Sequence, residues 1–576
     1  MPARRRSRGA ALTRTAETGT EPRSDSSNPN LALAIVLSAS FVQLVDVSIV
    51  NVAIPSIQSE LSAPNSAIQL IVAGYALAFA CILITAARLG DIYGRKRLFV
   101  TGMIGFTVAS ALCGAAPNAY VLVGARLLQG LMSGLMYPQV LSVIQVEFPP
   151  ERRGKAFSVY GAVIGIATII GPLLGGSLIA WNLFGLGWRT VFFVNVPIGL
   201  LAAPAAVRWL RESRAPDAPR LDIPGALLAT LGLLLIIYPI SVGQDRGWPW
   251  WTWALLAAAV PVFAVFVVYQ RRKTRADDSP LVQMTLFRDR SFVVGILLVL
   301  VFFSGVAPFF FTTTLYLQVG FGFTPFEAGL TTFPFAVGSG VASALSDRLV
   351  RRFGKWVLSA GTLILVLGML AAMVVVDLAG TRVSIAELAP VFLFAGVGLG
   401  LFIAPVTNLV LSHVRAEDTG SASGVLTTVQ RVAAAAGLAV AGSMLFALVS
   451  ANADLAAAAV SPQLRNRLGD TTLEQPVREE IVAGFTDCFT ARASASDPSM
   501  SPPACEDLRQ RVQGLDLGSA ARQQLGATVE RLSSRDALRR DYALSYRETL
   551  AYQVTVFSIA FLLVFALPGG TRHSDG

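Results

Sequence analysis

Charged residues are scarce in this chain. Only 14% of its 576 residues are Asp, Glu, Lys or Arg, whereas 54% are hydrophobic and the mean hydropathy is +0.60. A soluble protein of this length needs more polar surface than that to enclose its core. The composition therefore excludes a soluble globular protein and predicts an integral membrane protein.

Histidine and cysteine are also rare. The sequence has two histidines, His413 and His573, and four cysteines. Neither residue type shows the spacing of a metal or haem site, so we expect no metal, no cofactor and no histidine-based active site. The sequence also has no Walker motif and no constellation of catalytic residues, so we expect neither an ATP-driven pump nor an enzyme.

Long apolar stretches recur along almost the whole chain. In a helix, about 20 apolar residues at about 1.5 Å each cross the ~30 Å hydrocarbon core of a bilayer. The sequence therefore predicts an all-α integral membrane protein with about fourteen transmembrane helices. The predicted spans are residues 31–54, 68–89, 98–116, 121–144, 157–180, 190–210, 223–240, 252–269, 292–317, 328–345, 357–376, 388–411, 422–449 and 550–567.

Basic residues orient these spans. Each basic segment follows an even number of predicted spans, and the segments are the N-terminus, 95–97, 152–155, 208–220, 271–275, 348–355 and the C-terminal tail. Because cytoplasmic loops carry an excess of Lys and Arg, both termini are predicted to be cytoplasmic. The net charge of +10 then needs no nucleic acid as a partner, since these cations face anionic lipid.

One long polar segment, residues 450–549, separates the last two spans. By the parity of the spans it is extracytoplasmic, and long loops cross the membrane whatever their charge. It contains Cys488 and Cys505, which an oxidising outer compartment would allow to form a disulfide. Two free cysteines in a loop are the alternative.

The string GPLLGG, residues 171–176, lies in an apolar run that also contains Gly161 and Gly165. A proline flanked by glycines lets a membrane helix bend and lets a neighbouring backbone approach closely, as a moving transport bundle requires. An ordinary packing face of small residues is the alternative.

Two ionisable residues fall inside predicted spans. Asp46, in LVDVSIVNVAIP, lies about 22 Å along its helix, and Arg126, in ARLLQGLMSGLMYP, lies within the fourth span. An ionisable group in hydrocarbon is expensive unless it is paired or protonatable, which predicts a functional role. A structural hydrogen-bonding role for Asp46 and a bundle-stabilising role for Arg126 are the alternatives. Span nine contains five phenylalanines, residues 302, 303 and 309–311. They could line a cavity, but we expect at least half of them to face lipid.

The loop ARLGDIYGRKR, residues 87–97, joins spans two and three. It places Asp91 at a cytoplasmic helix end among cations, with glycines that permit a tight turn. A weaker echo, SALSDRLVRRFGK with Asp347, follows span ten. A charged turn that merely obeys the charge asymmetry of the loops is the alternative.

Taken in order along the chain, these motifs resemble the major facilitator superfamily, and more narrowly its fourteen-span drug:proton antiporter family. The resemblance covers residues 31–450 and the final span, although Ala87 and Ser48 depart from the usual motifs and Gln430 and Arg431 stand in exchanged order. The residues that match the family's motifs are Asp46, Asn51, Pro55, Leu89, Gly90, Asp91, Gly94, Arg95, Lys96, Arg97, Arg126, Gln129, Gly130, Gly165, Gly171, Pro172, Gly175, Gly176, Asp347, Gln430 and Arg431.

The resemblance implies two six-helix bundles related by a pseudo-two-fold axis, an inserted helix pair, and a substrate cavity near the membrane midplane. The expected organisation is a basic cytoplasmic tail (1–30), an N-terminal bundle (31–211), the inserted pair (222–270), five helices of a C-terminal bundle (291–449), the extracytoplasmic segment (450–549), the last span (550–567) and a cytoplasmic tail (568–576).

The resemblance also implies a function, a proton-driven exporter of hydrophobic small molecules or drugs in a bacterial cytoplasmic membrane. Asp46 and Arg126 are the candidates for proton coupling. The 87–97 loop is expected to switch conformation, and GPLLGG to seal and flex the bundle interface. The expected partners are substrate, protons and lipid, with a monomer as the default. The alternatives are a dedicated exporter of one endogenous metabolite, antibiotic, siderophore or lipid, and a membrane sensor or enzyme that uses the 450–549 segment.

Overall fold

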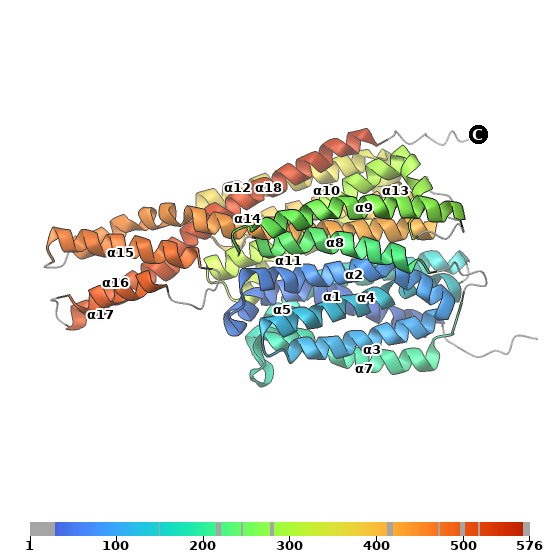
Figure 1. The fold of residues 1–576 in the computed structure, drawn as a ribbon, viewed down its shortest axis with the longest axis horizontal. Helices are drawn as coiled ribbons and strands as arrows, with labels where there is room; N and C mark the ends of the chain where they lie inside the picture. Colours follow the sequence, from blue (N-terminus) through green and yellow to red (C-terminus); the bar gives the residue numbers. More distant parts are fainter. Residues whose placement is uncertain are drawn as a thin grey trace, which may run out of the picture.

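The structure is a computed structural model that describes residues 29–148, 150–214, 221–243, 246–276, 281–411, 419–469, 473–495, 502–515 and 519–567. Every regular element within these residues is a helix. Thirteen helices in the described part of the chain are long and apolar enough to cross a membrane, and α5 adds the apolar stretch Ile170–Trp181. The predicted all-helical membrane fold is confirmed (Figure 1).

The first half of the chain forms a bundle with six spans, which we call the first bundle. Its helices are α1 (Pro29–Leu61), α2 (Asn65–Tyr93), α3 (Arg95–Gly114), α4 (Ala119–Glu147), α5 (Pro150–Trp181), α6 (Thr190–Phe193) and α7 (Asn195–Trp209). The short α6 and α7 together make the sixth span. Helix α4 packs against α2 and α3, and α1 packs against α5, so that α1 and α4 both face the centre of this bundle.

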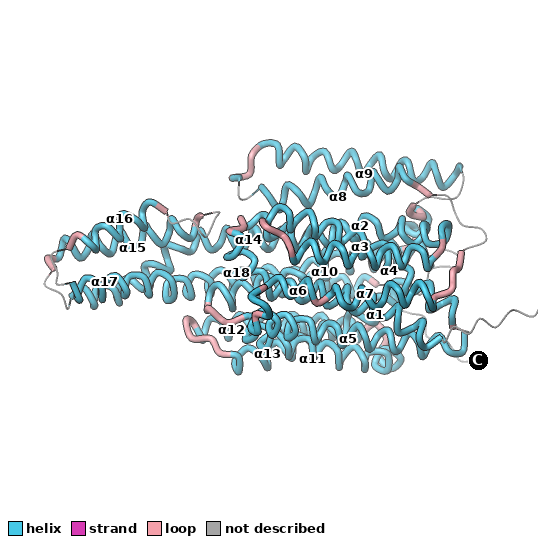
Figure 2. Tube along the Cα trace, turned by 90° about the horizontal axis from the view of Figure 1, so that it is seen from below, coloured by secondary structure: helices cyan, strands magenta, loops and turns pink. Residues whose placement is uncertain are grey.

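The next two helices form a separate hairpin. Helices α8 (Ile223–Gly243) and α9 (Trp250–Ala276) pack along each other, and Figure 2 shows them on one side of the molecule. Only 11% of the most apolar window of α9 is buried, against 67% for α2. The hairpin therefore presents most of its apolar surface to lipid.

The second bundle contains the remaining spans. Its helices are α10 (Arg290–Leu315) with its π-helical extension η5 (Tyr316–Gly320), α11 (Pro325–Phe353), α12 (Trp356–Ala379), α13 (Ile385–Leu411), α14 (Thr419–Gly469) and α18 (Leu538–Ala566). Of the five phenylalanines in the ninth span, Phe302, Phe309 and Phe311 are fully buried. Phe302 stacks on Phe402 of α13 with ring centroids 3.6 Å apart. These rings form the core of the second bundle, so the expectation that at least half face lipid is wrong.

Local hydrogen bonds explain where several of these helices begin. The Asn118 side chain accepts a hydrogen bond from the Val121 backbone at the start of α4, and Asp289 accepts one from Ser291 at the start of α10. Helix α11 begins with a capping box in which Thr324 and Glu327 bond each other's backbone N–H groups. Each cap satisfies amides that the first helical turn leaves without an intrahelical partner.

The segment after the thirteenth span is a helical domain of its own. Helix α14 does not end with its membrane span: its 51 residues extend about 77 Å, more than twice the hydrocarbon thickness. It is followed by α15 (Gln475–Ala493), α16 (Pro503–Gln513), α17 (Ser519–Arg531) and η7 (Leu532–Ala537). We call residues 450–537 the outer domain, after the side on which the sequence predicts them. Figures 1 and 2 show it projecting from one end of the bundles.

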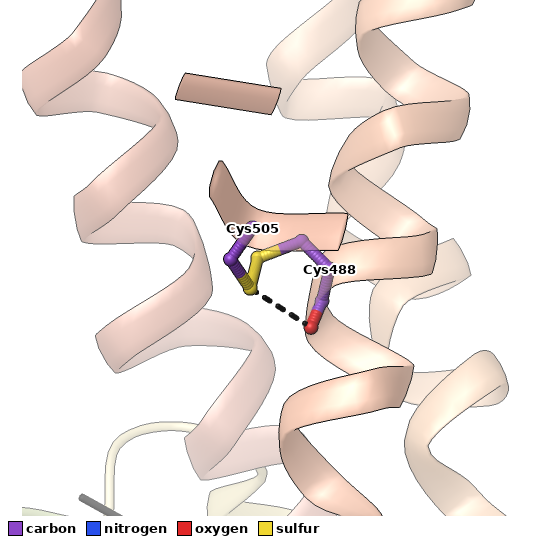
Figure 3. The surroundings of a disulfide bond; sticks show 2 residues. All are labelled: Cys488 and Cys505. Atoms are coloured by element: carbon purple, nitrogen blue, oxygen red, sulfur yellow. Dashed lines mark hydrogen bonds between the residues drawn. A yellow bond between two sulfur atoms is a disulfide. The ribbon is translucent and has the colours of Figure 1, made fainter. Parts of the chain in front are cut away.

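The outer domain has a hydrophobic core that is separate from those of the bundles. Leu464 of α14, Phe485 of α15 and Leu508 of α16 are among its buried residues. A disulfide between Cys488 and Cys505 joins α15 to α16 (Figure 3). The packing and the cross-link together hold the domain as one body on the ends of α14 and α18.

Candidate functional site

A buried ion pair occupies the centre of the first bundle. The Nη1 atom of Arg126, on α4, lies 2.6 Å from Oδ2 of Asp46, on α1. The two side chains are 2% and 0% exposed. The sequence placed each residue inside a span, and the structure brings them together. A buried ion pair is tolerated only when further hydrogen bonds compensate for the lost water.

Three more polar side chains supply those hydrogen bonds. Oδ1 of Asp46 accepts from Gln129 Nε2 and from Asn195 Nδ2, both at 2.8 Å. Oγ of Ser110 accepts from the same two amides, at 2.7 and 3.4 Å. All five side chains are buried. We call Asp46, Ser110, Arg126, Gln129 and Asn195 the polar cluster.

Arg126 is held by its other donors and by aromatic rings. Its Nε donates to the backbone oxygen of Ile71 at 3.1 Å, and its Nη1 also donates to Oε1 of Gln129 at 2.6 Å. The guanidinium carbon lies 4.2 Å from the ring centroid of Tyr75 and 5.7 Å from that of Phe192. Cation–π contacts of this kind partly replace the hydration that burial removes. The polar cluster thus connects every spanning helix of the first bundle except α5.

An aromatic layer lies between the polar cluster and the second bundle. Phe79 stands one turn along α2 from Tyr75, and Tyr137 packs against it with ring centroids 5.6 Å apart. Arg431, on α14 of the second bundle, places its guanidinium 4.5 Å from the Phe79 centroid. The hydroxyls of Tyr137 and Tyr160 lie 2.7 Å apart. Arg431 is therefore a half-buried cation at the bundle interface, where it faces aromatic rings of the first bundle.

The segment 87–97, expected to be a loop, is helical except at Gly94: residues 87–93 end α2 and residues 95–97 begin α3. Oδ1 of Asp91 accepts from Arg95 Nη2 at 2.8 Å and from its Nε at 3.2 Å. Gly94 makes the turn with φ +113°, a conformation that side chains disfavour. Glu212, which the sequence analysis did not single out, accepts from the Lys96 backbone and lies 3.6 Å from Arg97. This carboxylate, beyond the end of α7, neutralises cations of the loop.

Leu89 and Gly90 belong to the last two turns of α2. Leu89 is half-buried, and Gly90 lies against the amide end of the Gln139 side chain of α4, which would have to move to make room for a Cβ. Asp91 pairs with Arg95 and Arg97 with Glu212, and all four residues belong to the first half of the chain. A contact with the second bundle, as the resemblance implies for Asp91, stays a prediction.

GPLLGG lies where α5 meets both bundles. A Cβ on Gly175 would lie 2.7 Å from Cγ1 of Ile49 on α1, and Gly171 lies against Ser48 of the same helix. A Cβ on Gly176 would instead lie 2.7 Å from Cα of Phe326, on α11 of the second bundle. The motif therefore needs glycine because two different backbones approach it.

Two contacts extend this interface. A Cβ on Gly329 of α11 would lie 2.7 Å from the backbone oxygen of Pro172. Gln318 Nε2, from η5, donates to the backbone oxygen of Val52 on α1 at 2.9 Å. Gly165 also lies in α5, where the structure does not describe its surroundings.

The remaining motif residues have separate surroundings. Asn51 donates to the Val47 backbone within α1 at 3.2 Å, outside the polar cluster. Gly130 packs against the backbone of Tyr75, which lets α4 and α2 approach closely. Gln430 is half-buried on α14. Asp347 belongs to α11, but its side chain lies outside what the structure describes.

Comparison with known proteins gives consistent relatives. The family model described as Major Facilitator Superfamily matches residues 36–438. A "Probable actinorhodin transporter" of Streptomyces coelicolor is 36% identical over 547 residues, covering 95% of this chain and 93% of that protein. "Multidrug resistance protein Stp" of Mycobacterium tuberculosis is 33% identical over 447 residues, covering 77% and 78%. A "Tetracenomycin C resistance and export protein" of Streptomyces glaucescens is 34% identical over 416 residues, covering 72% and 75%.

Solved structures share the fold at low sequence identity. A bacterial homolog of the human lysosomal transporter Spinster, in an inward-facing and occupied conformation, superposes with a TM-score of 0.58 at 16% identity. It covers 94% of this chain and 97% of that one. A structure of a proton-dependent oligopeptide transporter gives 0.54 at 13% identity and covers 94% and 99%. These matches support the arrangement of the helices.

Proposed function

This chain belongs to the Major Facilitator Superfamily, and we propose that it is a proton-driven exporter of hydrophobic small molecules or drugs. Relatives named for multidrug resistance and for antibiotic export support the direction and the substrate class. The observation that carries the proton coupling is the buried pair of Asp46 and Arg126, since intramembrane ionisable groups mark proton relays in transporters.

Asp46 is the group that carries the proton in this proposal. Its carboxylate accepts hydrogen bonds from Arg126, Gln129 and Asn195. A proton on Oδ2 would turn this acceptor into a donor and leave Arg126 Nη1 with Gln129 Oε1 as its one remaining acceptor. One proton thus changes how α1 is bonded to α4.

Helix α1 can transmit that change to the second bundle. Within about two turns it carries Asp46, then Ile49 against Gly175, then Val52, whose oxygen accepts from Gln318 of the second bundle. A shift of α1 on protonation would alter both contacts at once. This continuous path supports alternating access driven by the proton.

The described contacts between the bundles support a state that is closed on the outer side. Gly176 lies against Phe326, Gly329 against Pro172, and Ser443 Oγ of α14 donates to Gln69 of α2. Gly176 lies near the end of α5, Phe326 near the start of α11 and Gln69 near the start of α2, and the order of the spans predicts that these helix ends lie on the outer side. The 87–97 segment lies at the other end of α2 from Gln69, and because of its cations we propose that this end is cytoplasmic.

The aromatic layer with Arg431 supports a hydrophobic, aromatic substrate. Phe79, Tyr137 and Tyr160 offer ring faces near the bundle interface, and Arg431 adds a cation that stacks on planar groups. A midplane cavity between two bundles is where transporters of this architecture bind substrate.

Transport into inverted vesicles tests the proposal. Ethidium should accumulate when the lumen is acidic, with protons leaving the lumen at the same time, and collapse of the pH gradient should abolish both. Vesicles without the protein are the control. Accumulation that survives loss of the pH gradient would exclude proton antiport.

A dedicated exporter of one compound is the second candidate. The relative that aligns over 547 residues, a length that must include most of the outer domain, is named for transport of a single compound. The multidrug and tetracenomycin relatives align over 447 and 416 residues. Competition separates the candidates, because a multidrug exporter should be slowed by several unrelated hydrophobic compounds and a dedicated one by a single chemical series.

A further inference from the structure

A cavity lies where the two bundles meet the outer domain. Its volume is about 210 Å³. The first bundle contributes Pro55 and Gln58, the second bundle contributes Phe446 and Tyr542, and helix α15 of the outer domain contributes Phe489 and Arg492. The outer domain therefore completes a hollow that the bundles alone would leave open. This cavity is separate from the polar cluster and from the aromatic layer around Arg431.

The walls of the cavity combine aromatic surface with one charge. Phe446, Phe489 and Tyr542 supply ring surface, and Arg492 is the one ionisable cation among the lining residues, which include no Asp or Glu. Among the described residues, no carboxylate pairs with Arg492. Neighbouring arginines of the outer domain differ, since Arg465 pairs with Glu479 and Arg511 with Glu480.

This combination selects a particular class of ligand. A guanidinium presents several donors in a planar fork that binds a carboxylate through two hydrogen bonds. The volume is below the ~300–1,000 Å³ of pockets that enclose drug-sized molecules, so it suits one or two fused rings. An aromatic ring system with an acidic group matches the walls, the charge and the size.

We infer that this cavity is a binding site for a small aromatic anion on the outer face of the protein, with Arg492 binding the acidic group and Phe446, Phe489 and Tyr542 packing against the rings. The amide of Gln58, which is bonded to Asn65 at 2.8 Å, forms the polar edge on the first bundle.

The position of the site gives it a second property. Because its walls come from both bundles, a bound ligand contacts both and stabilises the state in which their outer ends are together. An aromatic anion in the outer solution should therefore slow the transport cycle. This consequence rests on the proposed transport function, whereas binding itself does not.

Binding is tested on the full-length protein in lipid nanodiscs, with 1-naphthoate as the probe and its neutral analogue 1-naphthalenemethanol for comparison. Calorimetry should show naphthoate binding at least about tenfold more tightly than the alcohol, as expected for a charge-assisted hydrogen bond. Arg492→Gln should remove that difference. Arg509→Gln, an exposed arginine of α16 outside the cavity, is the matched control and should preserve it.

Three results would overturn the inference. They are equal binding of both probes to the wild type, unchanged naphthoate affinity in Arg492→Gln, and loss of binding in Arg431→Gln alone, which would assign the probe to the bundle interface. Phe489→Ala should weaken both probes, because it removes ring contact and not charge. Monodisperse protein with an intact disulfide shows that each variant has folded.

Transport tests the second property separately. Naphthoate trapped inside inverted vesicles, where it meets the outer face, should slow ethidium accumulation by the wild type and not by Arg492→Gln. If the vesicles move no ethidium at all, the proposed function fails while the binding result still decides the site. Binding without any slowing would refute the bridging role.

Discussion

Ile49 of α1 and Gly175 of α5 lie so close that a Cβ on Gly175 would be 2.7 Å from Cγ1 of Ile49. Ile49 follows Asp46 by three residues, and so the carboxylate that we propose carries the proton lies within one helical turn of a close contact between α1 and α5. This closeness is why we treat the polar cluster and GPLLGG as parts of one device.

Substitution of Gly175 tests the packing half of that device. Gly175→Leu adds a branched side chain where the Ile49 backbone oxygen would be 3.1 Å from Cβ, so α5 must move away from α1. Transport should fall by about tenfold or more while substrate binding persists. Gly124→Leu is the control, since no atom lies within 4 Å of a Cβ there. Equal transport by the two variants would reduce the motif to ordinary packing.

The 87–97 loop gives a second test. Asp91→Asn keeps the shape of the side chain but removes the charge that accepts from Arg95. If the segment biases a conformational equilibrium, as the family resemblance implies, we expect transport to be slower by about fivefold or more with substrate affinity unchanged. Glu212→Gln should act in the same direction, since Glu212 holds the neighbouring cations. A lower affinity with unchanged turnover would place the loop at the substrate instead.

The sequence identifies the charged residues of this site, but not every polar residue that binds them. Asp46 and Arg126 were identifiable because charge in an apolar helix is costly in any fold. Ser110 and Glu212 were not, because a serine in a membrane helix and a glutamate beside an arginine cluster are ordinary until packing brings them to a partner. Asn195 lies in the predicted sixth span, but its bond to Asp46 required the fold.

Helix α14 shows the same limit for the fold. Hydropathy ended the span at residue 449, since the following residues are too polar for the bilayer. The helix continues to Gly469, because that stretch is rich in alanine, which favours helix in water as well as in lipid. Hydropathy therefore predicts a membrane boundary but does not predict the end of the helix.

The basic segments follow an even number of predicted spans, which predicts that these segments and both termini are cytoplasmic. Reporters fused at Lys273, beyond the apolar part of α9, and at the C-terminus should both report the cytoplasm. An outer signal at Lys273 with a cytoplasmic signal at the C-terminus would mean that the α8–α9 hairpin does not cross as two spans.

The disulfide between Cys488 and Cys505 predicts a labelling pattern. In intact cells a membrane-impermeant maleimide should label these positions only after reduction, because bonded sulfurs do not react. Cys81 and Cys113 lie in the bundle and should be replaced by alanine to remove background. Serine at both outer positions should destabilise the outer domain by about 3 kcal/mol. Labelling without reductant would show that the bridge is not formed in the cell.

Asp46 provides the most demanding test. Asp46→Asn resembles the protonated side chain permanently, so the variant should bind substrate and exchange it down a gradient, yet lose accumulation driven by a pH gradient by at least about tenfold. Asp377→Asn, which breaks an ion pair with Arg547 on the surface of the second bundle, is the matched control and should transport normally.

Asp46→Asn leaves the buried Arg126 without its ion-pair partner, which costs about 3–5 kcal/mol of stability. A second variant is needed to separate this loss of stability from a loss of proton coupling. The double variant Asp46→Asn with Arg126→Gln removes that cation and should recover thermal stability without recovering proton-driven accumulation. Recovery of both would mean that the single variant had failed only by unfolding. If Asp46→Asn itself keeps pH-driven accumulation and only lowers substrate affinity, Asp46 is a binding or structural residue. The coupling proton must then bind elsewhere in the chain.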